Sequence, residues 1–303
     1  MIRGVSMIEE MKTFIAVVEE NNFTRAGEKI NLSQPSVSLH INKLEKYFDE
    51  TLINRSSKEK KIHITENGKI LYMRIKEILK VIEDTKEEFQ LEKNMLTGKV
   101  KIGASFTVGE NYLPKLIGKI KTNNPFLNIE IYIKNTKEIL EEIDRLEIDF
   151  AIVEGDFDKS IYEYKVLHED EMILACSKQL EEKIEEMKFA DMDKLSWVFR
   201  EEGSGTRASG IEFLKEINVL PKDILVMGSN NSIKEYLRYG LGITFISKLV
   251  VFEYIESNYI SWIKRELSYK RKYYLVKKKL ERKNHKIEVI LKELEDIKKS
   301  GEI

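Results

Sequence analysis

The sequence predicts an all-α winged helix-turn-helix over residues 6–65, a long helix over 66–96 and an α/β region over 98–303. Three observations lead to this division. Two short helical segments joined by a turn occupy residues 23–42. A stretch without proline, in residues that favour helix, follows them, and short β-branched runs then alternate with helical segments. A chain of 303 residues is long enough for two or three domains.

The helix-turn-helix is predicted from the spacing of its apolar residues and from its caps. Phe14 and Val17 lie on the apolar face of an opening helix, and Asn31 suits the left-handed conformation that ends the next helix. Ser33 is a suitable N-cap for a further helix, with Pro35 in its first turn. The residues of that helix expected to pack inward are Val37, Ile41, Leu44 and Phe48.

The opposite face of this helix carries small, polar, basic and aliphatic side chains: Ser36, Leu39, Asn42, Lys43 and Lys46. Polar side chains can read base edges in a major groove, and an aliphatic one can contact a thymine methyl group. The alternative is an ordinary solvated face, because helix-turn-helix geometry also occurs in proteins that bind no DNA. The net charge of −1 excludes a generally basic coat, so DNA affinity must come from local charge.

Basic residues gather over 55–61, directly before an alternating segment over 61–65. This pattern is typical of a β-hairpin wing that meets phosphates, although a solvated turn is the alternative. Over residues 21–65, eight basic side chains face five acidic ones, which leaves a surplus of three positive charges. We expect that surplus to act at the wing.

These residues resemble the LysR-type family of bacterial transcriptional regulators. The matching positions are Phe14, Phe23 to Ala26, Leu32 to Ser38, Ile41, Leu44, Glu45, Leu52 to Arg55 and Thr65 to Gly68. This sequence departs from the family at Gly27 and Asp49, and at Leu39, where many members carry an arginine that faces the DNA. The residues expected to contact DNA are Thr24, Arg25, Ser33, Gln34, Pro35, Ser36, Ser38, Leu39, His40, Asn42, Lys43 and Arg55.

The long helix is expected to begin after the N-cap residue Thr65 and to run to about residue 96. Residues at alternating three- and four-residue steps form the seam of a coiled coil, namely Leu71, Ile75, Ile78, Ile82, Thr85 and Phe89. Packing on the helix's own domain is the alternative. A dimer would present two recognition helices to two half-sites. In the family this is the linker helix, and the assemblies are homodimers or homotetramers.

The α/β region is predicted from eight short strands, over 99–103, 128–134, 150–154, 171–177, 197–200, 224–228, 243–247 and 273–277. Helices are expected over 112–123, 137–145, 206–217, 232–239 and 284–299. This alternation implies largely parallel sheets with a ligand crevice beyond the carboxyl ends of the strands. The resemblance implies an effector domain of two hinged subdomains, like a periplasmic binding protein. Subdomain I would hold 98–165 and 268–303, and subdomain II 166–267.

Three loops at strand ends, over 103–109, 201–207 and 228–232, combine glycines, hydroxyls and helix starts. Such loops can bind a small anion, although Ser and Thr at helix starts are more often only N-caps. The residues expected to bind the effector are Ser105, Phe106, Thr107, Glu154, Gly203, Ser204, Gly205, Thr206, Arg207, Ser229 and Asn230. We expect Glu154 to pair with Arg207, to take a hydrogen bond from an amine, or to serve a structural ion pair.

The same loops resemble the LysR branch that regulates sulfite reduction and cysteine synthesis, with regulators of carbon dioxide fixation as close relatives. Members of that wider group sense small anionic metabolites. The resemblance therefore implies a sulfite, sulfate-like or O-acetylserine-like effector and no cofactor. Operator DNA and the effector are the expected partners, with RNA polymerase as a further candidate.

Several other classes of protein are disfavoured. The four histidines form no metal-ligand pattern, and the Gly-Ser-Gly-Thr-Arg loop lacks the lysine of a nucleotide-binding loop. Cys176, the only cysteine, lies in an apolar strand and suits a buried small hydrophobe. No apolar run could span a membrane, which favours a cytoplasmic protein. The remaining alternative to a regulator is a solute-binding or catalytic α/β protein with a helical oligomerisation module.

Overall fold

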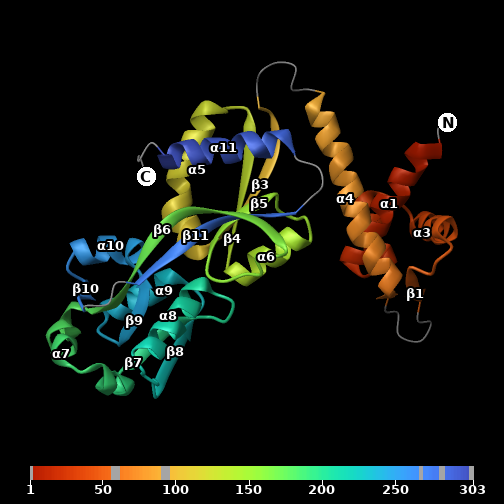
Figure 1. Cartoon of the computed structure of the whole chain (residues 1–303). Helices are drawn as coiled ribbons and strands as arrows, with labels where there is room; N and C mark the ends of the chain where they lie inside the picture. Colours follow the sequence, from red (N-terminus) through yellow and green to blue (C-terminus); the bar gives the residue numbers. More distant parts are fainter. Residues whose placement is uncertain (1–2, 56–61, 90–95, 266–268, 280–283, 300–303) are drawn as a thin grey trace. The chain divides into compact units, whose positions relative to one another are not determined.

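The computed structural model describes residues 3–55, 62–89, 96–265, 269–279 and 284–299. The chain divides into two compact units, Met1–Glu92 and Lys93–Ile303 (Figure 1).

The first unit is a winged helix-turn-helix followed by a long helix. Its elements are α1 (Arg3–Glu20), α2 (Phe23–Ile30), α3 (Gln34–Phe48), β1 (Ile53–Arg55), β2 (Ile62–Ile64) and α4 (Glu66–Glu88). The strands β1 and β2 pair antiparallel, which confirms the second strand of the wing. The basic segment over 56–61 lies outside the described residues. The core gathers buried residues of α1, α2, α3 and α4, among them Phe14, Val37 and Ile75.

The caps of the helix-turn-helix agree with the prediction. Asn31 adopts the left-handed conformation with φ 56°, and the Ser33 hydroxyl accepts a hydrogen bond from the backbone N–H of Ser36 at the start of α3. Thr65 accepts one from the backbone N–H of Gly68, at 2.9 Å, at the start of α4. The prediction that Phe48 packs inward was wrong. Its side chain is 38% exposed because it lies in the last turn of α3, next to Asp49, which ends the helix.

The helix α4 is 23 residues long, and residues 90–95, over which it was predicted to continue, lie outside the described part of the chain. Two residues of the predicted coiled-coil seam pack against the core of their own unit and not against the second helix of a coiled coil. Ile75 is fully buried in the core of the first unit, and Leu71 packs against the same core. The side chains of Ile78 and Phe89 are exposed, so the remaining part of the seam is free of that core.

The second unit is built on one nine-stranded sheet of mixed direction (Figure 1). The strands are β3 (Gly98–Ser105), β4 (Leu127–Lys134), β5 (Phe150–Glu154), β6 (Tyr162–Ser177), β7 (Ser196–Arg200), β8 (Asp223–Met227), β9 (Ile243–Ser247), β10 (Ile260–Ile263) and β11 (Tyr269–Lys278). They follow the order β4-β3-β5-β11-β6-β9-β7-β8, and β10 pairs with β6.

The expectation of largely parallel sheets holds only toward the two ends of this sheet. The strands β3, β4 and β5 pair parallel, as do β7, β8 and β9. The long strands β6 and β11 run antiparallel to each other and to their neighbours β9 and β5. The polar first half of β6 was missed because its alternating charged residues gave no apolar signal, and the short apolar β10 was not predicted either.

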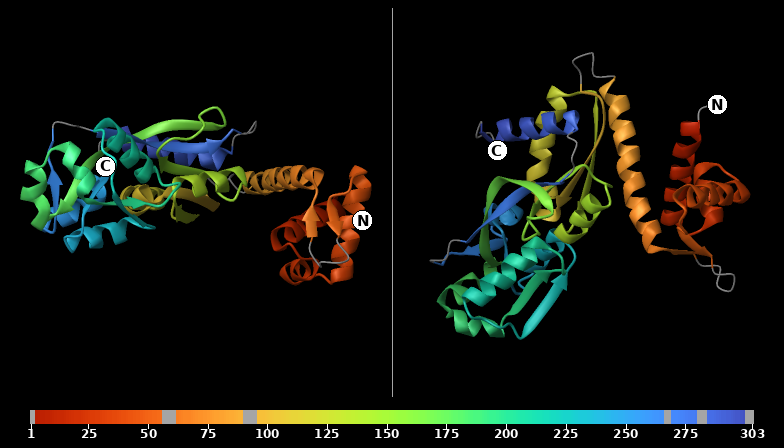
Figure 2. Two further views of the ribbon diagram at one scale, coloured as in Figure 1. Left: turned by 90° about the horizontal axis from the view of Figure 1, so that it is seen from below. Right: turned by 45° about the vertical axis from the view of Figure 1, so that its right-hand side comes forward.

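Helices cover both faces of each half of this sheet (Figure 2). In the half with β3, β4 and β5, α5 (Leu113–Asn123) and α11 (His285–Lys299) pack on one face and α6 (Thr136–Asp144) on the other. In the half with β7, β8 and β9, α7 (Glu181–Glu186) and α8 (Gly205–Glu216) oppose α9 (Asn230–Arg238) and α10 (Lys248–Glu256). We call these halves subdomains I and II. The strands β6 and β11 extend through both of them. The helices α7 and α10 were not predicted.

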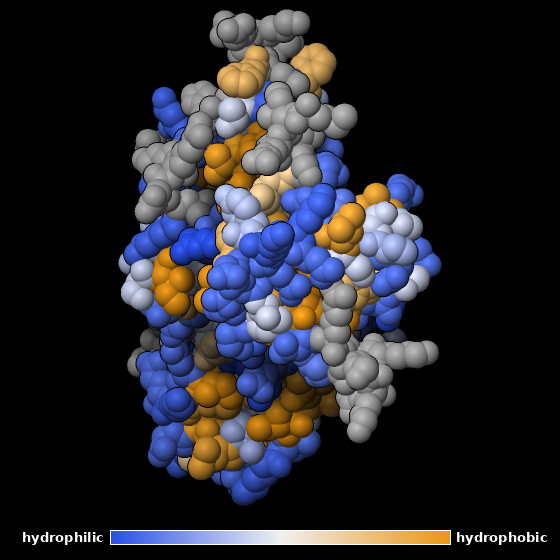
Figure 3. Space-filling view, turned by 90° about the vertical axis from the view of Figure 1, so that its right-hand side faces the viewer, coloured by the Kyte–Doolittle hydropathy of each residue, from blue (hydrophilic) through white to orange (hydrophobic). Residues whose placement is uncertain are grey.

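The surface seen in Figure 3 is mainly hydrophilic, with hydrophobic side chains in separate patches. Within the described residues, no helix combines the length and the hydropathy that crossing a bilayer requires.

Candidate functional site

The first candidate site is the outward face of α3 in the first unit. Pro35, Leu39 and Asn42 are exposed there. The amide of Gln34 donates a hydrogen bond to the Ser38 hydroxyl at 3.1 Å, so these two side chains are held together at the helix start. Other predicted contact residues lie around this face. Thr24 and Arg25 are exposed at the start of α2, and the Ser33 and Ser36 hydroxyls bond to each other. The side chain of Arg55 lies outside the described part.

Two predicted DNA-contact residues are engaged with α1. The Nζ of Lys43 lies 3.1 Å from the carboxylate of Glu10, which is 5% exposed. The Nδ1 of His40 lies 2.8 Å from the Thr13 hydroxyl, which itself donates to the backbone oxygen of Glu9. His40 must therefore donate through Nδ1 to Thr13. Both side chains fix the angle of α3 against α1.

The second candidate site is a buried polar cluster at the centre of the second unit. It consists of Ser105, Thr107, Glu154, Asp170, Arg200, Thr206, Asn230, Ser247 and Arg271, and none of these side chains is more than 6% exposed. We call it the central polar cluster. Its members come from the ends of β3, β5, β7 and β9, from the starts of α8 and α9, and from β6 and β11. It therefore joins both subdomains.

Arg271 on β11 is the hub of the central polar cluster. Its Nε donates to a carboxylate oxygen of Asp170 at 2.7 Å, and its Nη1 donates to the Thr206 hydroxyl at 3.0 Å. A carboxylate oxygen of Glu154 lies 3.7 Å from Nη1. Burial opposes the charged guanidinium, but Glu154 and Asp170 outweigh it and raise the pKa of Arg271. Its Nη2 is a buried donor that has no hydrogen-bond partner in the structure.

Glu154 contacts Arg271, which matches the expected alternative of a structural ion pair and not the pairing with Arg207. The Ser105 hydroxyl donates to the carboxylate of Glu154. Arg207 instead donates through Nη1 to the backbone oxygen of Arg200 at 2.9 Å. Burial raises the pKa of Glu154; Arg271 opposes this rise and Asp170 adds to it. Glu154 therefore holds its proton to a higher pH than an ordinary glutamate.

A second chain of hydrogen bonds connects the cluster to β7. Arg200 donates to the Asn230 side chain at 2.9 Å, and Asn230 donates to the Thr107 hydroxyl at 3.3 Å. The Thr107 and Thr206 hydroxyls are 3.2 Å apart, so hydroxyls from both subdomains meet. Arg200 is also ion-paired with Glu201, and its guanidinium stacks on the ring of Phe106 at 4.4 Å.

The subdomains also touch directly through backbone atoms. The N–H of Lys137 donates to the carbonyl oxygen of Gly203 at 3.2 Å. A Cβ atom on Gly205 would lie 2.4 Å from the carbonyl oxygen of Glu154, so only glycine permits this approach. Ser204 and Ser229 serve as N-caps of α8 and α9, which is the alternative role that the sequence left open for them.

A cavity of about 650 Å³ lies beside these contacts. Among the predicted effector residues, Gly203, Ser204, Gly205 and Arg207 line it. The others belong to the central polar cluster or to its edge and do not line this cavity. Its wall includes Thr136, Lys137, Tyr162 and Lys215.

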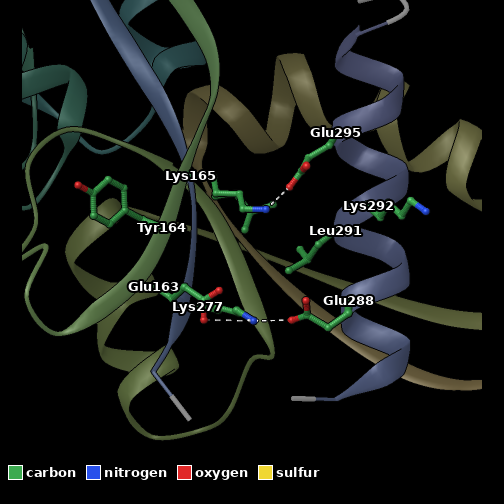
Figure 4. A pocket seen from close by; sticks show the side chains of 9 residues that line it. Glu163, Tyr164, Lys165, Lys277, Glu288, Leu291, Lys292 and Glu295 are labelled. Atoms are coloured by element: carbon green, nitrogen blue, oxygen red, sulfur yellow. Dashed lines mark hydrogen bonds and ion pairs between the residues drawn. The ribbon is translucent and has the colours of Figure 1, made fainter. Parts of the chain in front are cut away.

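A smaller cavity of about 300 Å³ lies between α11 and the strands β6 and β11 (Figure 4). Lys277 lies 2.6 Å from Glu288 and 3.4 Å from Glu163, and Lys165 pairs with Glu295. Its lining holds three lysines and three glutamates. These charges balance, so the cavity has no net attraction for an anion.

Four members of the central polar cluster were missed from the sequence: Asp170, Arg200, Ser247 and Arg271. The sequence contains a pattern that could have identified Arg271 as an inward-facing residue. It shares one sheet face with Tyr273 and Leu275 at two-residue steps, and both of these are buried. The predicted strand began only at residue 273, which left Arg271 outside the pattern.

Cysteine and metal chemistry find no support in the described residues. Burial raises the pKa of Cys176 to about 12, so its thiol is an inert core group. Among the residues that the structure describes, no three His, Cys, Asp or Glu side chains are arranged so that they could hold a metal ion.

Comparison with known proteins gives two family matches. Residues 8–69 match the bacterial regulatory helix-turn-helix of the lysR family, and residues 93–297 match the LysR substrate binding domain. The HTH-type transcriptional regulator CysL of Bacillus subtilis is 39% identical over 86% of this chain and 89% of its own length. A probable RuBisCO transcriptional regulator of Phaeodactylum tricornutum is 30% identical over 86% of each chain.

Among solved structures, full-length CbnR complexed with its target DNA has a TM-score of 0.66 and 18% identity, over 95% of this chain and 99% of that one. This structural similarity indicates that the two proteins have the same fold. The curated relatives are transcriptional regulators, which confirms the expected regulator over a catalytic or solute-binding α/β protein.

Proposed function

Because this chain belongs to the LysR family of DNA-binding transcriptional regulators, we propose that a small anion bound at its central polar cluster controls its action on DNA. Regulators of this family bind operator DNA and small-molecule effectors and oligomerise. The observation that carries the proposal is the Nη2 of Arg271, a buried donor without a partner, among hydroxyls from both subdomains. A buried polar group without a hydrogen bond is costly, and an anion would satisfy it.

The central polar cluster would supply several donors to an oxyanion that displaces Glu154, the present acceptor of the Ser105 hydroxyl. The hydroxyls of Ser105, Thr107 and Thr206 lie close to Arg271 through the contacts described above. The start of α8, a helix of 12 residues, adds a partial positive charge at Gly205 and Thr206. Sulfite, sulfate-like and O-acetylserine-like metabolites carry the oxygen acceptors that this donor set requires.

Glu154 would act as the internal competitor of the effector. Glu201 neutralises Arg200, so the charge left around the anion comes from Arg271, Asp170 and Glu154. That charge is negative overall when Glu154 is ionised and zero when it is protonated. An incoming anion would therefore displace the Glu154 carboxylate from Arg271 or bind when Glu154 is protonated.

The two subdomains would move about β6 and β11, the strands that extend through both. Opening would break the hydrogen bond from Lys137 to Gly203, and closing on the anion would restore it. An effector that binds the closed form better shifts the equilibrium toward it. Effector binding would in this way be coupled to the arrangement of the oligomer on DNA.

Exposed apolar side chains in the second half of α4, and Phe89 directly after it, support a dimer seam. The side chains of Ile78, Val81 and Phe89 are 43%, 41% and 77% exposed, whereas Leu71 and Ile75 are used by the unit's own core. We place the seam in the second half of α4, and a pair of such dimers would give the homotetramer. A regulator that acts on operator DNA works in the cytoplasm.

A thermal-shift titration of the full-length protein with sulfate, sulfite and O-acetylserine tests the effector site. A specific ligand raises the melting temperature with its concentration. We expect Ser105→Ala and Thr206→Ala to lose that rise and to keep basal binding to the upstream DNA in a gel shift. Thr122→Ala is the matched control, because its exposed hydroxyl donates only to its own helix α5. An equal response in all variants would contradict the site.

A further inference from the structure

The outward face of α3 has an aliphatic side chain at its centre. Leu39 is 54% exposed, whereas Val37 and Ile41 on the same helix are fully buried. Residues of an α-helix follow each other at about 100°, so Leu39 lies about 160° around the axis from both buried residues. It therefore points directly away from the core of the first unit.

The side chains around Leu39 are held in place by neighbours. On one flank, His40 and Lys43 are tied to α1 through Thr13 and Glu10. Toward the start of α3, Gln34 is hydrogen-bonded to Ser38. These contacts fix the rotation of the helix. Leu39 is consequently presented at a defined place on the face and cannot be turned aside without breaking them.

Exposed leucines are common on protein surfaces and need no special role by themselves. Leu39 differs because it belongs to the second helix of a helix-turn-helix, whose first residues enter the major groove in this class of motif. It is the sixth residue of α3. The other large exposed apolar residues of α3, Tyr47 and Phe48, lie in its last turn and contact each other with ring centroids 5.0 Å apart.

In the major groove the methyl group of thymine is the apolar feature that a leucine can contact. Leucine has no donor or acceptor. Against guanine, adenine or cytosine it would cover a polar base edge and leave that edge without a hydrogen bond, which is unfavourable. Contact with a thymine methyl removes apolar surface of both partners from water instead.

We propose that Leu39 reads one thymine in each operator half-site through its 5-methyl group. The proposal rests on the DNA binding of the family and is independent of the effector site. Burying one methyl-sized group changes the affinity about fourfold. Loss of the methyl contact should therefore weaken DNA binding about fourfold for each half-site.

The test begins with selection of binding sequences from random DNA by the full-length protein. We expect a thymine in each half-site for the wild type, no preference at that position for Leu39→Ala and guanine for Leu39→Arg, since arginine binds the guanine edge through two hydrogen bonds. Leu39 is exposed, so the alanine variant should fold, and an unchanged thermal melting curve verifies this.

A change on the DNA isolates the methyl group without altering the protein. Replacing that thymine by uracil should weaken wild-type binding about fourfold per half-site and leave Leu39→Ala unaffected. The matched control Tyr47→Ala, which changes another exposed side chain of α3, should respond to uracil like the wild type. The proposal is overturned if uracil weakens the wild type and Leu39→Ala equally, or if no uracil position weakens the wild type.

Discussion

Replacing Arg271 by methionine tests whether the central polar cluster holds the second unit together. Methionine keeps much of the aliphatic volume of arginine, so the change removes mainly the charge and its hydrogen bonds. Asp170 would lose its partner at 2.7 Å while it keeps the Ser247 hydroxyl, and Glu154 would lose the cation that lies 3.7 Å away. Removing one partner of a buried ion pair costs about 3–5 kcal/mol of unfolding free energy.

The assay is urea unfolding of the full-length protein followed by tryptophan fluorescence. The chain has two tryptophans, Trp197 and Trp262, and both lie in the second unit, so the signal reports on that unit. Lys165→Met is the matched control, since it breaks an ion pair whose lysine side chain is 62% exposed. Surface pairs contribute about 0–1 kcal/mol. Equal losses in the two variants would refute the reasoning.

Three further predictions concern the same molecule. Because burial raises the pKa of Glu154, sulfate should bind more tightly as the pH falls through that raised pKa, and Glu154→Gln should abolish this dependence in calorimetric titrations at a series of pH values. Gly205→Ala should weaken sulfate binding, because its Cβ would meet the Glu154 carbonyl at 2.4 Å, whereas Gly118→Ala, with open space around it, should not. Ser33→Ala should lower the stability of α3 by about 1 kcal/mol, measured by hydrogen exchange of its amides; unchanged protection would count against the cap.

The sequence predicted the elements whose signals are local. The helix-turn-helix follows from apolar spacing, from Ser33 and Asn31 as caps and from Pro35 in the first turn, and the structure has these features. Most strands and helices of the second unit were also found, because each carries its own apolar pattern within a few residues. The family motifs lie in these segments, so the regulator was recognisable before its fold was known.

Only the tertiary structure decided which polar side chains meet. Arg271 and Asp170 are 101 residues apart, and nothing near either of them in the chain indicates the other. Their pairing depends on the antiparallel register of β6 and β11, which the expectation of parallel sheets did not contain. The same holds for Leu71 and Ile75, whose spacing suits a coiled coil although the fold buries them in their own unit. Periodicity determines which face of an element is apolar, whereas the partner of that face depends on long-range packing, and local sequence does not encode it.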